Sequence, residues 1–398
     1  MRTEPQGAPF VPARLTAARK RCALTTVALS VESGISTKSL SEYENGKKEP
    51  SPETVRRLAR ALEVSADYFA RPPLDDIPPD AVSFRARSKM PRRYEDMALA
   101  IASHAVELRL WIDQHYETPP VDVPTLHKYS GVFEAAKAAS VVRARWGLGS
   151  APLGNMIHLL ELHGVAVFST TAHKTDVLDA FSFRADGQPY VLLCTTKSPE
   201  RGRFDAAHEL GHLVLHGEET KARGPEAERE ADAFASEFLM PEADVRAQMR
   251  MNPRLDQIFK TKHRWGVAAI ALSYRLHDLG LLSDWLYHTT CVDLSRMGYR
   301  SGEPNGKIER ESSKLLGQVM SDLLTTPGGF GGLCRDLDVQ PSGVNDLIFN
   351  LAPLVVRGEG QRSVPIRPEL HVVDGGTKPL FSQRHLISSG LGGFKNRL

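Results

Sequence analysis

Two histidines four residues apart, His208 and His212, are the feature that most constrains this 398-residue chain. They lie in the segment HELGH, with Glu209 directly after the first histidine. Residues four apart share one face of a helix, so both imidazoles can bind a single metal ion. Zinc accepts imidazole nitrogens in tetrahedral geometry, and a catalytic zinc keeps one position for water. The spacing therefore predicts a helix that carries two zinc ligands.

Glu209 is the predicted general base of this site. Its place in the motif sets it beside the metal, where it can take a proton from the bound water. Apolar neighbours such as Leu210, Leu213 and Val214 indicate a buried helix. Burying two histidines and a glutamate without a metal would leave polar groups in need of other partners. A chance match on a solvated surface helix is therefore the less favoured interpretation.

A third protein ligand is expected from the next helix, EAEREADAFASEFLMP, because two imidazoles leave zinc short of its usual three. Glu230 is the predicted ligand, since it lies one turn before Phe234 on the edge of the apolar stripe. Glu226 and Glu228 fall outside that stripe and are expected to be solvated. Asp232 could orient a ligand histidine as its hydrogen-bond partner.

Two further features near the motif have predicted supporting roles. His216 lies four residues beyond His212, but on one straight helix a third ligand there would lie about 6 Å further along. We therefore expect His216 to be a helix-end cap. A strand near Tyr190–Cys194 is predicted to hold substrate in extended form, because an unpaired strand edge beside a metal is a template for a peptide strand.

The N-terminal residues 13–70 read as a compact helical module, with turns expected at Gly34 and Gly46. The third helix, STKSLSEYENG, presents short polar and basic side chains suited to base edges and phosphates. Residues 12–71 hold eleven Lys and Arg against seven Asp and Glu, a local excess of four positive charges. A protein-binding helical bundle is the alternative. The predicted DNA-contact residues are Thr26, Ser36, Thr37, Lys38, Ser39, Ser41, Lys47 and Lys48.

Composition excludes several other classes of protein. Lys and Arg number 50 against 48 Asp and Glu, so bulk charge does not indicate a nucleic-acid protein, and any basic patch is local. The four cysteines form no CxxC pair, which excludes a disulfide framework or a cysteine-rich zinc ribbon. No signal peptide is visible, and no apolar run approaches the roughly 18 residues of a membrane span. We expect a cytoplasmic protein without a membrane partner.

The metal motif and its surroundings resemble the ImmA/IrrE-like metallopeptidase family. HELGHLVLHG followed by EREADAFASEFLMP carries the likeness, and GVAVFST, the hairpin after it, SPERGRFDAAHE and RWGVAAIALSYRLHDLGLL extend it over about 125–285. The resemblance implies a small thermolysin-like zincin of the bacterial cytoplasm. It places the family's HExxH on His208, Glu209 and His212, and its third-ligand glutamate on Glu230. Asp232 stands where the family commonly has Asn. The family commonly cleaves or inactivates a partner repressor.

The N-terminal module is similar to the phage-repressor-like (XRE/Cro-type) helix-turn-helix family from RLTAARKRC to SADYF. The specific parts are GIS, the turn Glu44-Asn45-Gly46-Lys47 and the continuation EPSPETVRRLARAL. The family often has Gln at the second position of its second helix, where this chain has Thr26. That difference removes one usual polar contact to DNA.

Together these features predict an α+β protein in four parts. They are an all-helical helix-turn-helix domain at 12–71, a linker and helical region at 72–124, a metallopeptidase domain with a short sheet at 125–285, and a mainly helical C-terminal region of unknown role at 286–398. Its partners would be double-stranded DNA and a repressor-type protein substrate, with a homodimer left open.

Three functions remain for such a chain. The first is a DNA-binding transcriptional regulator with a zinc-dependent endopeptidase domain that cleaves a repressor-type protein. The second is a regulator whose metallopeptidase-like domain is a sensor or interaction module without proteolysis. The third is a protein-interaction module, such as an antitoxin. The intact base favours the first, because a pure sensor would not need Glu209.

Overall fold

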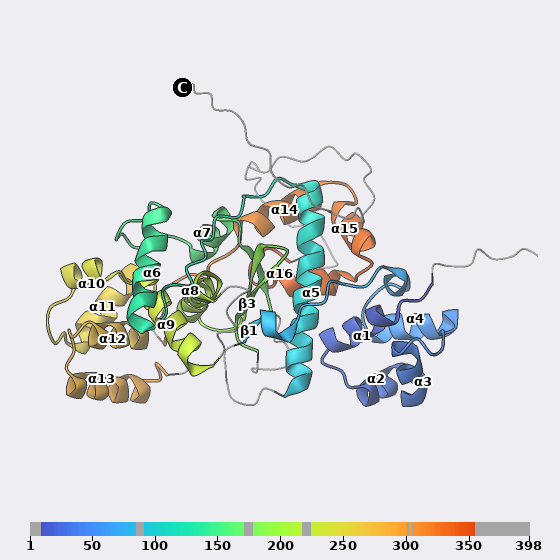
Figure 1. Ribbon diagram of the computed structural model, residues 1–398, viewed down its shortest axis with the longest axis horizontal. Helices are drawn as coiled ribbons and strands as arrows, with labels where there is room; N and C mark the ends of the chain where they lie inside the picture. Colours follow the sequence, from blue (N-terminus) through green and yellow to red (C-terminus); the bar gives the residue numbers. More distant parts are fainter. Residues whose placement is uncertain are drawn as a thin grey trace, which may run out of the picture.

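The computed structural model describes residues 9–84, 91–170, 178–216, 224–300, 302–304, 306 and 308–354. It is α+β, as predicted: many helices surround one small sheet. The long helix α5 (Arg92–His115) stands in the middle of the molecule, with the N-terminal helices on one side and the sheet with its covering helices on the other (Figure 1). No helix in these ranges combines the length and the apolar character needed to cross a bilayer.

The N-terminal domain consists of four helices, consistent with the compact helical module expected from the sequence. Ser36 and Ser51 cap the third and fourth helices through hydrogen bonds to backbone N–H groups, as expected from their short polar side chains. Gly34 and Gly46 adopt the left-handed conformation that these turns require. The helices are α1 (Pro12–Arg21), α2 (Thr26–Ser33), α3 (Thr37–Glu44) and α4 (Pro52–Ala61), followed by the 3₁₀ turns η1 (Asp67–Ala70) and η2 (Pro79–Ala81).

The sheet has the strand order β1-β3-β4-β2. Its strands are β1 (Ser83–Phe84), β2 (Ala166–Ser169), β3 (Phe181–Ala185) and β4 (Gln188–Leu193). β3 and β4 form the predicted hairpin, with Asp186 and Gly187 both at positive φ in its turn. The prediction of an unpaired strand edge near Tyr190–Cys194 is wrong, because β4 pairs with β3 on one side and with β2 on the other.

β2 forms one outer edge of the sheet, and on the opposite side the two-residue strand β1 pairs with part of β3. The two strands are antiparallel, with Ser83 opposite Ser182 and Phe84 opposite Phe181. β1 belongs to the segment between the N-terminal domain and α5, so a piece of the interdomain connection is part of the peptidase-side sheet.

Helices cover the sheet in successive layers. Helix α8 (Pro199–Leu215) contacts β3 and β4, α9 (Pro225–Leu239) packs on α8, and α6 (Val132–Arg145) packs on α9. Helix α7 (Met156–Leu162) packs beside β2 and α8. The largest fully buried apolar side chains of this part are Phe168, Phe181, Phe183, Phe234, Phe238 and Trp265.

The remaining helices surround this core. They are α10 (Glu242–Gln248), α11 (Leu255–Trp265), α12 (Ala269–Asp278), α13 (Asp284–Arg296), α14 (Lys314–Thr325), α15 (Gly329–Leu337) and α16 (Pro341–Ile348). Trp111 and Trp265 are buried. Trp285 lies in the first turn of α13 and is 72% exposed.

The N-terminal domain is bonded to the rest of the protein at two places. Against α5, the guanidinium of Arg14 pairs with Glu107 at 2.7 Å, and the hydroxyl of Tyr68 lies 2.9 Å from Nε2 of His104. Against the C-terminal helices, Val64 forms an antiparallel β-bridge with Val339. The domain is thus docked by both buried polar groups and backbone pairing.

Candidate metal centre

Helix α8 packs closely against α9. Ser198 caps its start and Pro199 occupies its first turn, where a missing N–H has no cost. Gly211 faces α9: a Cβ added there would lie 3.2 Å from Cβ of Phe234 and 3.3 Å from Cα of Ala231. The glycine inside the HELGH motif is therefore what allows the two helices to approach.

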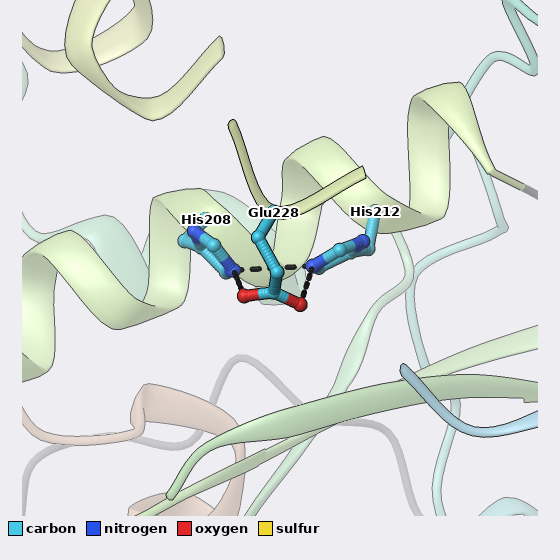
Figure 2. Close-up of side chains that lie close together, drawn as sticks. All are labelled: His208, His212 and Glu228. Atoms are coloured by element: carbon cyan, nitrogen blue, oxygen red, sulfur yellow. Dashed lines mark hydrogen bonds and ion pairs between the residues drawn. The ribbon is translucent and has the colours of Figure 1, made fainter. Parts of the chain in front are cut away.

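The structure brings His208, His212 and Glu228 together (Figure 2). The two Nε2 atoms are 3.1 Å apart. Oε2 of Glu228 lies 3.5 Å from Nε2 of His208, and Oε1 of Glu228 lies 3.5 Å from Nε2 of His212. Within the ranges described above, this is the one group of His, Cys, Asp or Glu side chains in which three ligand atoms converge, all within 4.8 Å of one another.

These three donors fit a tetrahedral zinc ion. With zinc bonds of 2.0–2.1 Å, two ligand atoms at tetrahedral corners are separated by about 3.3 Å. The two Nε2 atoms, 3.1 Å apart, have close to this spacing, and each oxygen of Glu228 lies 3.5 Å from a different one of them, so the carboxylate faces the same point as the two imidazoles. Two imidazoles and a carboxylate are also a donor set of catalytic zinc, which leaves the fourth position for water.

The predicted third ligand, Glu230, lies elsewhere, and this prediction is wrong. Its Oε2 is 2.7 Å from Nε2 of His216, and its Oε1 accepts hydrogen bonds from the backbone N–H of Gly131 and the hydroxyl of Ser130. Glu228, which the apolar pattern assigned to the solvated face, points at the two imidazoles instead (Figure 2). The stripe marks the side of α9 in the core, whereas the metal centre lies along its margin.

A signal for Glu228 was present in the sequence. Asp232 lies where predicted, with its carboxylate 2.8 Å from Nδ1 of His208. Residues four apart share a helix face, so an Asp232 that reaches a ligand histidine places Glu228, one turn earlier, beside the same histidine. Glu230 is only two residues from Asp232 and must point to a different side.

The charges of the cluster are strongly perturbed. Burial alone would lower the pKa of His208, but hydrogen bonds to Asp232 and Glu228 raise it to about 9. Burial lowers the pKa of His212 to about 4. Burial alone would raise the pKa of Glu228, yet its contacts with both imidazoles hold the pKa below its usual range. The carboxylate is therefore ionised, as a metal ligand must be.

Glu209 is fully buried beside the cluster, and burial raises its pKa to about 7. The hydroxyl of Ser182 donates a hydrogen bond of 2.7 Å to its Oε2. Sequence reasoning missed Ser182, because nothing in a strand pattern distinguishes one serine of β3 as the neighbour of a helix that begins 17 residues later. The contact fixes the carboxylate of Glu209 next to β3.

A cavity of about 600 Å³ adjoins the centre at Asp232. Its lining includes Phe204 and Asp205 of α8, Tyr274 of α12 and Tyr287 of α13.

The predicted DNA-contact residues lie on the surface around α3. Ser36, Thr37, Lys38, Ser41, Lys47 and Lys48 are exposed, and Thr26 and Ser39 are half-buried. The Ser36 hydroxyl accepts a hydrogen bond from the backbone N–H of Ser39, so part of its bonding capacity serves the helix cap. The third helix thus presents the polar face expected of a recognition helix.

Comparison with known families gives two matches. Residues 15–69 match the family described as helix-turn-helix, and residues 160–277 match the family described as IrrE N-terminal-like domain. The second match contains His208, Glu209, His212 and Glu228. A search among curated proteins gave no match. The chain joins an N-terminal XRE-type helix-turn-helix domain to an ImmA/IrrE-like domain of the metallopeptidase type, which supports a transcription regulator with a peptidase-like domain.

Proposed function

We propose that this protein is a DNA-binding transcription regulator and a zinc-dependent endopeptidase that cleaves a repressor-type protein. The observation that carries the proposal is the convergence of His208, His212 and Glu228 at zinc-like separations. Glu209, buried beside them and held by Ser182, adds a group that a zinc-binding sensor would not require.

In this mechanism, His208, His212 and Glu228 would hold zinc, and the bound metal would supply the Lewis-acid chemistry that makes water nucleophilic at neutral pH. Ser182 holds Oε2 of Glu209, so we assign proton transfer to Oε1. Oε1 takes a proton as water adds to the peptide carbonyl carbon, and passes it to the amine as the C–N bond breaks. Asp232 keeps the ring of His208 oriented through Nδ1.

The proposed substrate binds as an extended peptide. β3 contacts Glu209 through Ser182, and its outer edge is paired with the short strand β1. A peptide aligned with that edge would place one side chain toward the cavity beside Asp232. We further propose that the functional parts are 12–71, 72–124, 125–285 and 286–398, and that two copies bind a two-fold symmetric operator in the cytoplasm.

The test of proteolysis is the Glu209→Gln variant, incubated with candidate repressor proteins beside the wild type. The amide preserves the shape of the side chain but cannot take the proton, so cleavage should fall by a factor of about 10² to 10⁴. Zinc content, measured by metal analysis, should stay equal in the two proteins. Equal cleavage rates would remove Glu209 as the base, and a zinc-loaded wild type that cleaves none of the candidates would favour the sensor.

DNA binding is tested with Lys38→Ala in the full chain. Lys38 is exposed at the start of α3, where a phosphate contact would release counterions. We expect weaker binding to duplex DNA and a salt dependence that is flatter by about one unit of slope. Glu49→Ala, at an exposed acidic position of the same domain, is the control. An unchanged salt slope would show that Lys38 does not contact DNA.

A further inference from the structure

A chain of hydrogen bonds leads away from the second candidate ligand. Nδ1 of His212 lies 3.0 Å from Nδ1 of His216, and Nε2 of His216 lies 2.7 Å from Oε2 of Glu230. The other oxygen of Glu230 is fixed by the backbone N–H of Gly131, and Ser130 lies 3.3 Å from it. The side chains of His216 and Glu230 are only 7% and 6% exposed, so the chain is shielded from water.

One placement of protons satisfies every bond when His212 is a metal ligand. A neutral imidazole that gives Nε2 to a metal carries its proton on Nδ1. Nδ1 of His212 must then donate, and Nδ1 of His216 must accept. A neutral His216 that accepts at Nδ1 carries its proton on Nε2 and donates it to Glu230. The Glu230 carboxylate accepts this bond together with the one from Gly131.

We propose that His216 and Glu230 are positioning residues that select the tautomer and ring orientation of His212, and thereby present its Nε2 to the metal. The two candidate histidine ligands are then oriented in different ways. Asp232 bonds His208 directly, whereas Glu230 acts on His212 through one intervening imidazole. The proposal rests on metal binding at this centre and does not require that the protein cleave a substrate.

This relay of hydrogen bonds from His212 through His216 to Glu230 also connects the metal centre to a third helix. Glu230 belongs to α9, His216 follows the last residue of α8, and Gly131 precedes the first residue of α6. Because Gly131 N–H and His216 bind the two oxygens of one carboxylate, the start of α6 determines where Glu230 can accept. This explains why a buried carboxylate lies so near the metal cluster without joining it.

Glu230→Gln is the sharpest test, because it changes almost nothing but the proton pattern. The amide oxygen must stay with the N–H of Gly131, which turns the NH₂ group toward His216. His216 would then accept at Nε2 and carry its proton on Nδ1, where it opposes the Nδ1–H of His212. We expect zinc affinity to fall by a factor of about 10 to 100. Glu226→Gln, an exposed position one turn earlier on α9, is the matched control.

A second pair of variants separates the relay from simple packing. The side-chain amide of His216→Gln can accept from His212 and donate to Glu230. The zinc affinity of this variant should therefore stay within about threefold of the wild-type value. His216→Leu fills the space but breaks both bonds and should lose as much affinity as Glu230→Gln. If His216 only filled space, the leucine variant would not lose more zinc affinity than the glutamine variant.

The measurements are made on the full chain and need no substrate. Zinc dissociation constants come from competition with a chelator, and the visible absorption of the cobalt-loaded protein reports the ligand geometry. Thermal melting of the metal-free proteins checks that each variant is folded. Wild-type affinity and an unchanged cobalt spectrum in Glu230→Gln would overturn the relay, as would equal losses in His216→Gln and His216→Leu, or a wild type that binds no zinc.

Discussion

The contact that defines the candidate metal centre is the one between the carboxylate of Glu228 and two imidazoles. Glu228 lies within 3.5 Å of both Nε2 atoms, whereas Glu226 is exposed and Glu230 bonds His216. Three glutamates within five residues of one helix thus have three different environments. Their separate roles follow from the angle of about 100° between successive residues of a helix.

We predict that Glu228→Gln weakens zinc binding strongly and that Glu226→Gln does not. A neutral amide is a poor replacement for an anionic ligand, and the loss should reach a factor of about 100 or more in zinc affinity, close to 3 kcal/mol. Isothermal titration of the metal-free proteins with zinc measures both constants. Tight zinc binding by Glu228→Gln would show that the cluster is not the metal site.

How far the sequence predicts such residues depends on how local the interaction is. The spacing of His208 and His212 within one helix predicts that they meet, because i and i+4 neighbours are fixed by the helix itself. The choice between Glu228 and Glu230 depends on how α9 is rotated against α8. That rotation is set by contacts between the two helices, such as Gly211 against Phe234, which a single-helix pattern does not contain.

At the scale of elements, the sequence predicts helix starts well and strand neighbours poorly. Ser36 and Ser51 cap helices through atoms of their own segments, so the signal is local. The hairpin turn at Asp186 and Gly187 is equally local. The pairing of β4 with β2, and of β3 with β1, joins segments far apart in the chain, and no periodicity within one strand indicates which edge stays free.

The approach of α8 to α9 gives a prediction based on two glycines of one helix. Gly202 has room for a Cβ, so Gly202→Ala should stabilise the protein by up to about 1 kcal/mol through helix propensity. At Gly211 an added Cβ meets Cα of Ala231 and the side chain of Phe234 at 3.2–3.3 Å, and a backbone atom cannot move alone. Gly211→Ala should therefore be net destabilising by about 1 kcal/mol.

Thermal melting of the two variants measures the contrast, and zinc affinity provides a second reading. Because α9 carries Glu228, a shift of α9 away from α8 should also weaken the site in Gly211→Ala and leave it intact in Gly202→Ala. Equal melting temperatures for the two alanine variants would contradict the close packing at Gly211.

At the scale of the whole molecule, the docking of the N-terminal domain on α5 buries polar groups that must stay paired. His104 is fully buried: its Nδ1 donates to the carbonyl of Ala100, and its Nε2 accepts from Tyr68. Arg14 and Glu107 form an ion pair beside it, and Arg71 also reaches Glu107. Separating the domain from α5 would expose these groups, so the domain and α5 should unfold in a linked manner.

From this interface between the N-terminal domain and α5 we predict that the protein loses stability in weak acid. Burial lowers the pKa of His104 to about 4, so the folded protein keeps the ring neutral while the unfolded chain takes up a proton below about 6.5. Unfolding therefore binds an extra proton between these values, and stability falls as the pH drops from about 6.5 to about 4, by at most about 3 kcal/mol. The ion pair holds the pKa of Glu107 below its usual range, which acts in the same direction at lower pH.

The check is the melting temperature of wild type and His104→Gln at pH 7 and pH 5. Glutamine can accept the hydrogen bond from Tyr68 but does not titrate, so its melting temperature should depend less on pH over this interval. An equal drop in both proteins would assign the acid sensitivity to other groups.

Strand β1 has a consequence for which molecules can reach the metal centre. One edge of a strand offers a single set of backbone donors and acceptors, and Ser83–Phe84 already uses the part of β3 that carries Ser182. A tethered strand competes at an effective concentration in the millimolar range. A peptide that pairs with β3 at this point must displace β1, a segment of the same chain. If substrate binds along β3, as proposed, the interdomain connection sets the affinity that the substrate must exceed.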